Sequence, residues 1–133
     1  AQVFSNRLPP PIPFAAICVD MVGDKELTLP IERHSYMQAP QLVLDVWKLA
    51  AELGYNQFQM ELGRSIIDDH TAFYNQTGIP SIDIIDFDYP NAEMNYWHTL
   101  EDTPDKCSAE SLEAVGTVLI NYLFRLDLAL NEK

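Results

Sequence analysis

The sequence predicts an α/β protein, and two observations lead to this fold class. Apolar runs of strand length occur at Phe14–Val19, FAAICV, and within Ile79–Asp86. Between and after them come segments whose apolar residues recur at the spacing of an amphipathic helix, at Pro40–Leu53 and Ser108–Leu130. Strands that alternate with helices in this way are typical of α/β domains. With 133 residues, the chain corresponds to one domain.

The composition indicates a globular, acidic protein. Hydrophobic residues make up 47% of the chain and charged residues 21%, which excludes a disordered segment. The net charge of -12 argues against a nucleic-acid partner and against an anionic membrane surface, because both require basic patches. No apolar run is long enough to cross a bilayer. An acidic field favours cationic ligands instead, such as metal ions or free amino termini.

The first predicted strand ends in a candidate functional residue. Residues 1–13 are rich in proline and predict an extended lead-in. Phe14–Val19 is a continuous apolar run, as expected for a strand buried on both faces, and Asp20 follows it directly. Ligands of α/β proteins bind at the carboxyl ends of such strands. Asp20 could equally cap a turn, and its position in the sequence leaves both roles open.

Two helices are predicted from their boundaries and their apolar faces. Pro40 suits the first helical position of Pro40–Leu53, and Gly54 suits its end. We expect Trp47, which flanks the apolar face of that helix, to belong to the core. Ser108 is a good N-cap for the helix of Ser108–Leu130, whose apolar stripe predicts a structural role without chemistry.

Two further segments predict strands. Lys25–Arg33 is expected to be a short strand or a hairpin arm, because Pro30 favours an edge position. His34 is then expected in an exposed polar loop. Asn56–Met60 is a short strand candidate.

Carboxylates and two of the three histidines are concentrated between Ile66 and Thr103. Carboxylate and imidazole suit zinc where thiolates are absent. Several of these acids alternate with isoleucine, so some must be buried, and a buried carboxylate needs a partner or a metal ion. The structural alternative for Asp68 or Asp69 is an N-cap of a short helix at Asp68–Thr77. The acids and histidines form three clusters: Asp68, Asp69 and His70; Asp83, Asp86 and Asp88; His98, Glu101 and Asp102.

The two cysteines, Cys18 and Cys107, belong to no CxxC pair, which argues against a zinc–thiolate site. We expect two free and buried thiols, although the sequence also allows one disulfide between them.

Six short motifs in colinear order resemble the C-terminal half of the zinc aminopeptidase and glutaminyl cyclase family (peptidase clan MH). The resemblance covers about residues 14–125, and it implies a mixed β-sheet flanked by helices, of which this chain supplies part. The motifs are DMVG at 20–23, IIDDH at 66–70, GIP at 78–80, IDFDYP at 85–90, YWHT at 96–99 and a DT-DK-S-SL tail at 102–112.

The resemblance implies roles for individual residues at the matched positions. His98 resembles the last zinc ligand of the family. Asp20 resembles the aspartate that binds the second zinc in di-zinc aminopeptidases and takes part in a proton network in one-zinc cyclases. Asp68 resembles its partner in that network, and Trp97 resembles an aromatic wall of the substrate pocket. His70 matches the motif as well, but it could equally be a structural histidine.

The family motifs that supply the other ligands and the general base do not occur upstream of Asp20. A catalytic zinc keeps three protein ligands and one open position, whereas this chain offers one or two ligands. We therefore expect residues 1–133 to be a single unit, the C-terminal half of a zinc-exopeptidase-like domain. On this expectation the chain is inactive alone and has the N-terminal half of the domain as its partner.

Three functions remain open. The first is the C-terminal part of a zinc-dependent aminopeptidase that acts on peptide N-termini. The second is a glutaminyl-peptide cyclotransferase of the same family, and the third is a non-catalytic scaffold or binding module. The resemblance also favours an extracytoplasmic location, periplasmic or secreted.

Overall fold

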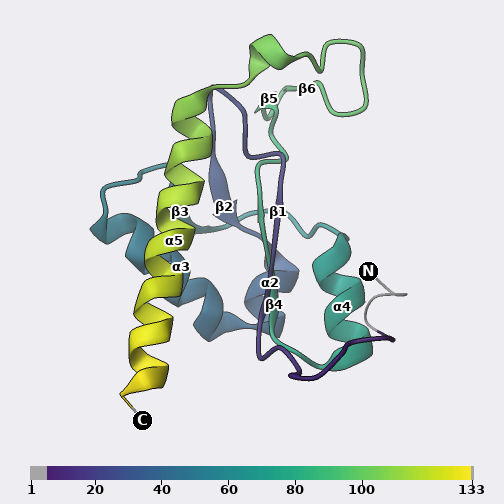
Figure 1. The fold of residues 1–133 in the computed structure, drawn as a ribbon. Coiled ribbons are helices and arrows are strands. Elements are labelled where there is room, and N and C mark those ends of the chain that lie inside the picture. Colours follow the sequence, from purple (N-terminus) through teal and green to yellow (C-terminus); the bar gives the residue numbers. More distant parts are fainter. Residues whose placement is uncertain (1–5, 133) are drawn as a thin grey trace.

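A computed structural model describes residues 6–132 of the chain. Two pairs of parallel strands form its centre, and helices lie around them (Figure 1). β1 (Ala16–Asp20) pairs with β4 (Ser81–Ile85), and β2 (Leu29–Ile31) pairs with β3 (Phe58–Leu62). A short antiparallel pair, β5 (Pro90–Asn91) and β6 (Met94–Asn95), completes the strands. The predicted α/β class with a mixed set of strands is confirmed.

β4 is the fully buried strand, and β1 is not. Every residue of β4 is buried, whereas Val19 of β1 is 42% exposed and Asp20 is also exposed. The expectation that Phe14–Val19 is buried on both faces is therefore wrong for this chain. The physical reason is that β1 pairs with β4 along one edge and with no other strand among residues 6–132. An apolar run forms a fully buried strand only where other elements cover both of its faces and other strands pair with both of its edges.

The segment predicted as a strand or hairpin arm at Lys25–Arg33 divides into two elements. Its strand part shrinks to β2, which is parallel to β3 and so is no hairpin arm. Glu32 then caps helix α2 (Arg33–Gln38), because its carboxylate accepts hydrogen bonds from the backbone of His34 and Ser35. His34 consequently lies in a helix and not in a loop, half-buried. Glutamate is not among the preferred N-cap residues, so the residue type alone did not indicate this cap.

The long helices follow the predicted boundaries. α3 (Pro40–Glu52) begins at Pro40, and its inner face carries Trp47, which is 1% exposed. The Trp47 indole N–H donates to the Leu29 carbonyl at 3.0 Å, and its ring meets the Phe58 ring edge-on. α5 (Ala109–Asn131) is capped by Ser108, as expected. The apolar core collects residues from β2, β4, α3 and α5, among them Leu29, Val43, Val46, Ile82, Ile84 and Val118.

The elements around β4 position the candidate site. Helix α4 (Asp69–Thr77) lies on one side of the β1–β4 pair, and α3 and α5 lie on the other (Figure 1). Asp68 caps α4, and Gly78 ends it in the left-handed conformation. The segment 86–103 extends beyond the carboxyl ends of β1 and β4 (Figure 1). It contains the small β5–β6 pair, and a 3-10 turn, Pro104–Lys106, then leads into α5.

The remaining expectations concern the lead-in, the thiols and membranes. Residues 1–5 of the lead-in lie outside the described part, and residues 6–13 form no helix or strand. Cys18 and Cys107 are free, as predicted, but Cys18 is half-buried and Cys107 is exposed, so the expected burial of both is wrong.

Across residues 6–132, no helix has the length and apolar character that crossing a bilayer requires.

We predict that Trp47→Ala lowers the free energy of unfolding by about 3–5 kcal/mol, because it leaves a cavity in a packed core and an unpaired Leu29 carbonyl. Urea denaturation measures the change. Lys48→Ala, at the exposed neighbouring position of the same helix, should stay within about 0.5 kcal/mol. Equal effects in the two variants would contradict the assignment of Trp47 to the core.

Candidate functional site

The parallel pairing of β1 and β4 places Asp20 beside the point where the chain leaves β4 toward Trp97 and His98. Asp20 is the last residue of β1 and lies opposite Ile85, the last residue of β4. The chain leaves β4 at this point and enters the segment that carries Trp97 and His98. The two halves of the predicted site therefore start from adjacent strand ends.

Asp20 and Asp68 influence each other electrostatically. Partial burial and the negative charge of Asp68 raise the pKa of Asp20. As the N-cap of α4, Asp68 accepts a hydrogen bond from the Asp69 backbone at 2.7 Å through one carboxylate oxygen. Both predicted roles of Asp68, as a cap and as a neighbour of Asp20, are thus compatible with its geometry. Two carboxylates near each other retain a proton more readily than either does alone.

A stacked series of rings holds His98. The Arg64 guanidinium lies 5.9 Å from the Phe87 ring centre, and Phe87 lies 5.3 Å from Trp97. Trp97 in turn stacks on His98, with ring centres 3.9 Å apart and planes at 20°. The imidazole therefore rests on an aromatic face and stays exposed to solvent, outside the apolar core.

Both site segments contain a residue with left-handed backbone conformation. Met21, directly after Asp20, has φ 54°, and His98 has φ 57°; they are the two residues other than glycine with positive φ in residues 6–132. Such conformations cost of order 1–3 kcal/mol and persist where the surroundings enforce them. The strain thus lies at His98 itself and at the residue directly after Asp20.

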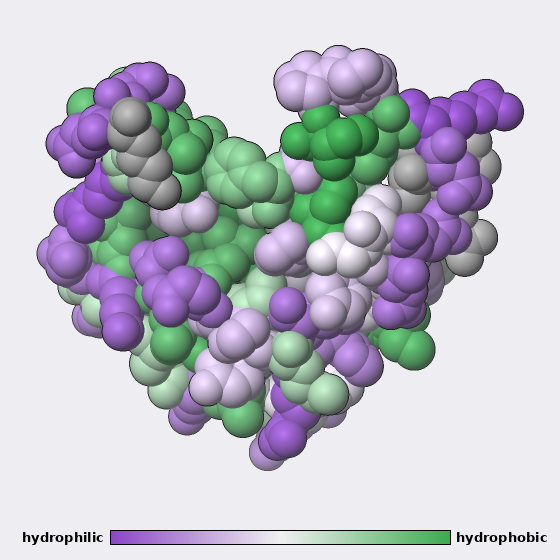
Figure 2. Space-filling model, turned by 90° about the horizontal axis from the view of Figure 1, so that it is seen from below, coloured by the Kyte–Doolittle hydropathy of each residue, from purple (hydrophilic) through white to green (hydrophobic). Residues whose placement is uncertain are grey.

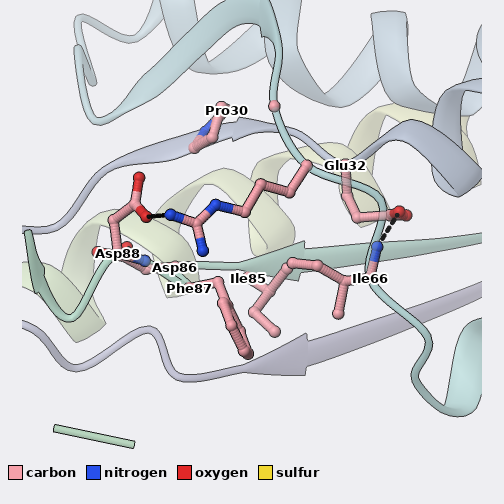
Figure 3. Close-up of a pocket in the computed structure, with 9 residues that line it drawn as sticks. Pro30, Glu32, Ile66, Ile85, Asp86, Phe87 and Asp88 are labelled. Carbon is pink, nitrogen blue, oxygen red and sulfur yellow. Dashed lines mark hydrogen bonds and ion pairs between the residues drawn. The ribbon is translucent and has the colours of Figure 1, made fainter. Parts of the chain in front are cut away.

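A small pocket of about 50 Å³ lies beside the base of this ring series (Figure 3). Arg64 forms an ion pair with Asp88 at 2.8 Å in its wall. Asp86, also in the wall, accepts hydrogen bonds from the Thr28 backbone and hydroxyl. Burial raises the pKa of Asp86 to about 7, with a further increase from the charge of Asp24.

Sequence reasoning missed a buried network centred on Glu32. Glu32 is 2% exposed, and its carboxylate accepts hydrogen bonds from the backbone of His34, Ser35 and Ile66. The Ser35 hydroxyl also donates to it at 2.8 Å, and His70 Nε2 lies at 2.8 Å. Burial alone would raise the pKa of Glu32, but these hydrogen bonds outweigh it and lower the pKa to about 2. Glu32 is therefore ionised at neutral pH.

The imidazole of His70 is shared between two acids. While Nε2 meets Glu32, Nδ1 lies 3.6 Å from Asp83 Oδ2, and all three side chains are buried. Burial, followed by the charge of Asp68, raises the pKa of Asp83 to about 8. The partners lie 38 and 13 residues from His70, so no sequence window contains this triad. It gives His70 a buried position between two carboxylates, away from solvent.

The three clusters read from the sequence do not persist as units. Asp83, Asp86 and Asp88 have separate partners: His70, Thr28 and Arg64 respectively. In the third cluster, Asp102 accepts a hydrogen bond from the Tyr89 hydroxyl at 2.9 Å. The structure thus places Asp68 near both Asp20 and Asp83, whereas Asp86, Asp88 and Asp102 have contacts elsewhere.

The donor set at this edge fits zinc in kind but is incomplete. Imidazole and carboxylate are zinc ligands, and Asp20 and His98 supply one of each. If both bound one zinc ion, they would be two of the three protein ligands that a catalytic zinc keeps. Asp68 would then lie beside the metal without binding it and would take part in proton transfer.

Comparisons with family models and with solved structures point to the same group of proteins. The model of Peptidase family M28 matches residues 13–123. The chain is similar to the glutaminyl cyclase of Porphyromonas gingivalis, with 35% identity and a TM-score of 0.86 over 94% of this chain and 47% of that one. No curated protein matches.

Two exopeptidase structures are similar as well. A Zn-dependent exopeptidase from Parabacteroides distasonis is 34% identical, with a TM-score of 0.78 over 89% of this chain and 42% of that one. A leucine aminopeptidase precursor from Bacteroides thetaiotaomicron is 32% identical, with a TM-score of 0.79 over 89% and 40%. The chain therefore spans less than half the length of these relatives.

We predict that Glu32→Gln lowers the free energy of unfolding by about 3–5 kcal/mol near neutral pH, because it leaves His70 and several N–H groups without their charged partner. Since the pKa of Glu32 is lowered in the folded state, its contribution is present above the ordinary value of 4.5 and is lost as the pH falls toward about 2. The difference between the variant and the native chain should shrink over this range.

Urea denaturation across an acidic pH series measures this difference. Glu113→Gln, an exposed position of α5, serves as the control and should change stability little at any pH. A Glu32→Gln deficit that stays constant down to pH 2 would contradict an ionised Glu32.

Proposed function

Because the chain belongs to Peptidase family M28, we propose that it is the C-terminal part of a zinc-dependent aminopeptidase-type metallohydrolase that acts on peptide N-termini. The observation that supports this proposal is that Asp20, with Asp68 near it, ends β1 directly beside the end of β4, from which the segment that carries His98 begins. Ligand sites of α/β proteins form at such edges.

In this proposal Asp20 and His98 hold zinc, and the rest of the domain supplies the remaining ligands. When bound, the zinc polarises the scissile carbonyl and lowers the pKa of its water. The raised pKa of Asp20 and the nearby charge of Asp68 suit a pair that holds and passes on a proton. Trp97, exposed and stacked on His98, forms an apolar wall for the first side chain of the substrate. The net charge of -12 attracts the substrate's free amino terminus.

The alternative activity is that of a glutaminyl-peptide cyclotransferase. The glutaminyl cyclases of Porphyromonas gingivalis and Tannerella forsythia, 35% and 34% identical to this chain, favour it. In a cyclase the substrate's amino group would attack its own side-chain carboxamide carbon, and the bond to the amide nitrogen would break to release ammonia. Asp20 and Asp68 would carry the proton from the attacking amine to the leaving nitrogen. Both activities use the same residues, so the geometry of this edge serves either.

The rest of the domain is proposed to pack on the open side of β1. A groove of about 370 Å³ lies there, between β1 and α5, with mainly apolar walls. Figure 2 shows hydrophobic residues lining a hollow on this side of the molecule. An exposed strand edge next to an apolar groove suits a further strand with apolar side chains. The groove is lined by Phe14, Ala15, Ile17, Val19, Leu119, Tyr122, Leu123 and Leu126.

A third possibility is a scaffold or binding module without catalysis. The incomplete ligand set supports it for the chain in isolation, which we expect to be inactive. A periplasmic or secreted location is also proposed, from the family resemblance, and cell fractionation would test it.

We predict that His98→Ala abolishes activity in the intact parent, together with the loss of bound zinc. The matched control is His34→Ala, in helix α2 away from this edge, which should retain activity. Hydrolysis of a leucyl amide, cyclisation of an N-terminal glutaminyl peptide and metal analysis provide the readouts. Cyclisation with one zinc per chain favours the cyclase, whereas hydrolysis with two favours the peptidase. Full activity of the His98→Ala parent would overturn the metal assignment.

We predict that Leu123→Asp prevents association of this chain with the N-terminal half of its domain, because a carboxylate would be buried in the apolar groove. Co-expression followed by size-exclusion chromatography measures the association. Met37→Asp, at a position that is 78% exposed on α2, is the control and should leave association intact. Equal association of both variants would argue against the groove as the docking surface.

A further inference from the structure

A group of three potential metal ligands lies deeper in the sheet than Asp20. Cys18 of β1 and Asp83 of β4 are direct partners in the parallel register. Asp68 approaches from the start of α4, with its Oδ2 at 3.9 Å from Cys18 Sγ. One ligand atom from each of the three residues lies within 4.8 Å of the other two.

The buried Asp83 carboxylate provides an independent indication of a ligand. Its side chain is 0% exposed, and its oxygens make no hydrogen bond of ordinary geometry outside the group, where their neighbours are Cys18 and Asp68. The nearest basic atom is His70 Nδ1 at 3.6 Å, on a ring that already meets Glu32 through Nε2. One imidazole therefore faces two buried carboxylates, and a third, Asp68, lies close by. Buried carboxylates are costly unless a cation or hydrogen bonds compensate them.

We propose that Cys18, Asp68 and Asp83 form a binding site for a thiophilic divalent cation such as Zn²⁺, separate from the Asp20 and His98 pair. One thiolate and two carboxylates are a donor set that zinc accepts. Zinc bonds of about 2.0–2.3 Å require the three atoms to move closer together, by roughly 1 Å. Binding displaces two protons into solvent: the thiol proton of Cys18 and the proton that Asp83, with its pKa raised to about 8, carries at neutral pH.

An access route and a fourth coordination position are available beside the thiol. A pocket of about 600 Å³ opens there, and its walls include Cys18, Asp69, His70 and Phe73. Water in this pocket can complete a tetrahedral site, and the ion can enter through it. The proposed site does not depend on the proposed enzymatic function. If both hold, an ion bound here engages Asp68 and removes it from proton transfer with Asp20.

Titration of the purified, chelator-treated chain with Co²⁺ tests the site. Thiolate coordination to Co²⁺ produces a charge-transfer absorption band, which the His98 and Asp20 pair cannot give because it contains no sulfur. We expect one Co²⁺ per chain with this band, and displacement of Co²⁺ by Zn²⁺. Cys18→Ser should abolish the band, whereas Cys107→Ser, which changes the exposed second cysteine, should retain it.

The carboxylates are tested by Asp68→Asn and Asp83→Asn, which should each weaken Co²⁺ binding by more than about tenfold. Asp86→Asn, at another fully buried aspartate next to β4, controls for the effect of a buried substitution. Circular dichroism checks the fold of each variant, and the half-exposed Asp68 provides the test if Asp83→Asn does not fold. Absence of the band at millimolar Co²⁺, or its persistence in Cys18→Ser, would overturn the proposal. Cys18, Asp68 and Asp83 would then interact only by sharing protons.

Discussion

The buried contact between Glu32 and His70 is the interaction on which the arrangement of this chain depends. It joins the start of α2 to the first turn of α4 across the carboxyl-terminal half of β4, at 2.8 Å and with both side chains almost fully buried. Ser35 extends the network, because its hydroxyl donates to Glu32 and accepts from the Asp83 backbone. The Glu32 carboxylate thus caps α2, contacts His70 and is linked to β4 through Ser35. Few alternative positions of α4 can satisfy all of these groups at once.

The position of α4 in turn determines where the site carboxylates lie. Asp68 caps this helix, so the contact that fixes His70 also fixes Asp68 two residues earlier. Asp68 then influences both Asp20 on β1 and Asp83 on β4. A local role as a cap and an electrostatic role at the strand ends are therefore filled by the same side chain. The opposite wall of the site is held differently, by aromatic stacking from Phe87 through Trp97 to His98.

Local patterns predicted those parts of the molecule whose determinants lie within a few residues. The boundaries of α3, α4 and α5 follow from Pro40, Asp68, Gly78 and Ser108, and the structure places each at the expected helix end. The exposure of β1 could not be predicted in this way, because an apolar run is the same whether or not a neighbouring strand covers it. His34 was misplaced for a related reason. The segment predicted as a strand continues to Arg33, but the strand ends at Ile31 and Glu32 caps a helix that contains His34.

The sequence by itself determined the α/β class, the helix boundaries, the family resemblance and the identity of Asp20, Asp68, Trp97 and His98 as candidates. The class and the helix boundaries rest on apolar spacing and on residues at the helix ends, and the four candidates rest on the family resemblance of short motifs. Only the tertiary structure decided which acids are partners: Glu32 with His70, Asp86 with Thr28, and Cys18 with Asp68 and Asp83. These partners lie far apart in the chain, and the residue type of an acid does not reveal whether its side chain is solvated or buried. Burial and the identity of the nearest charge arise only when distant segments pack together, and they set the ionisation and the ligand capacity of each group.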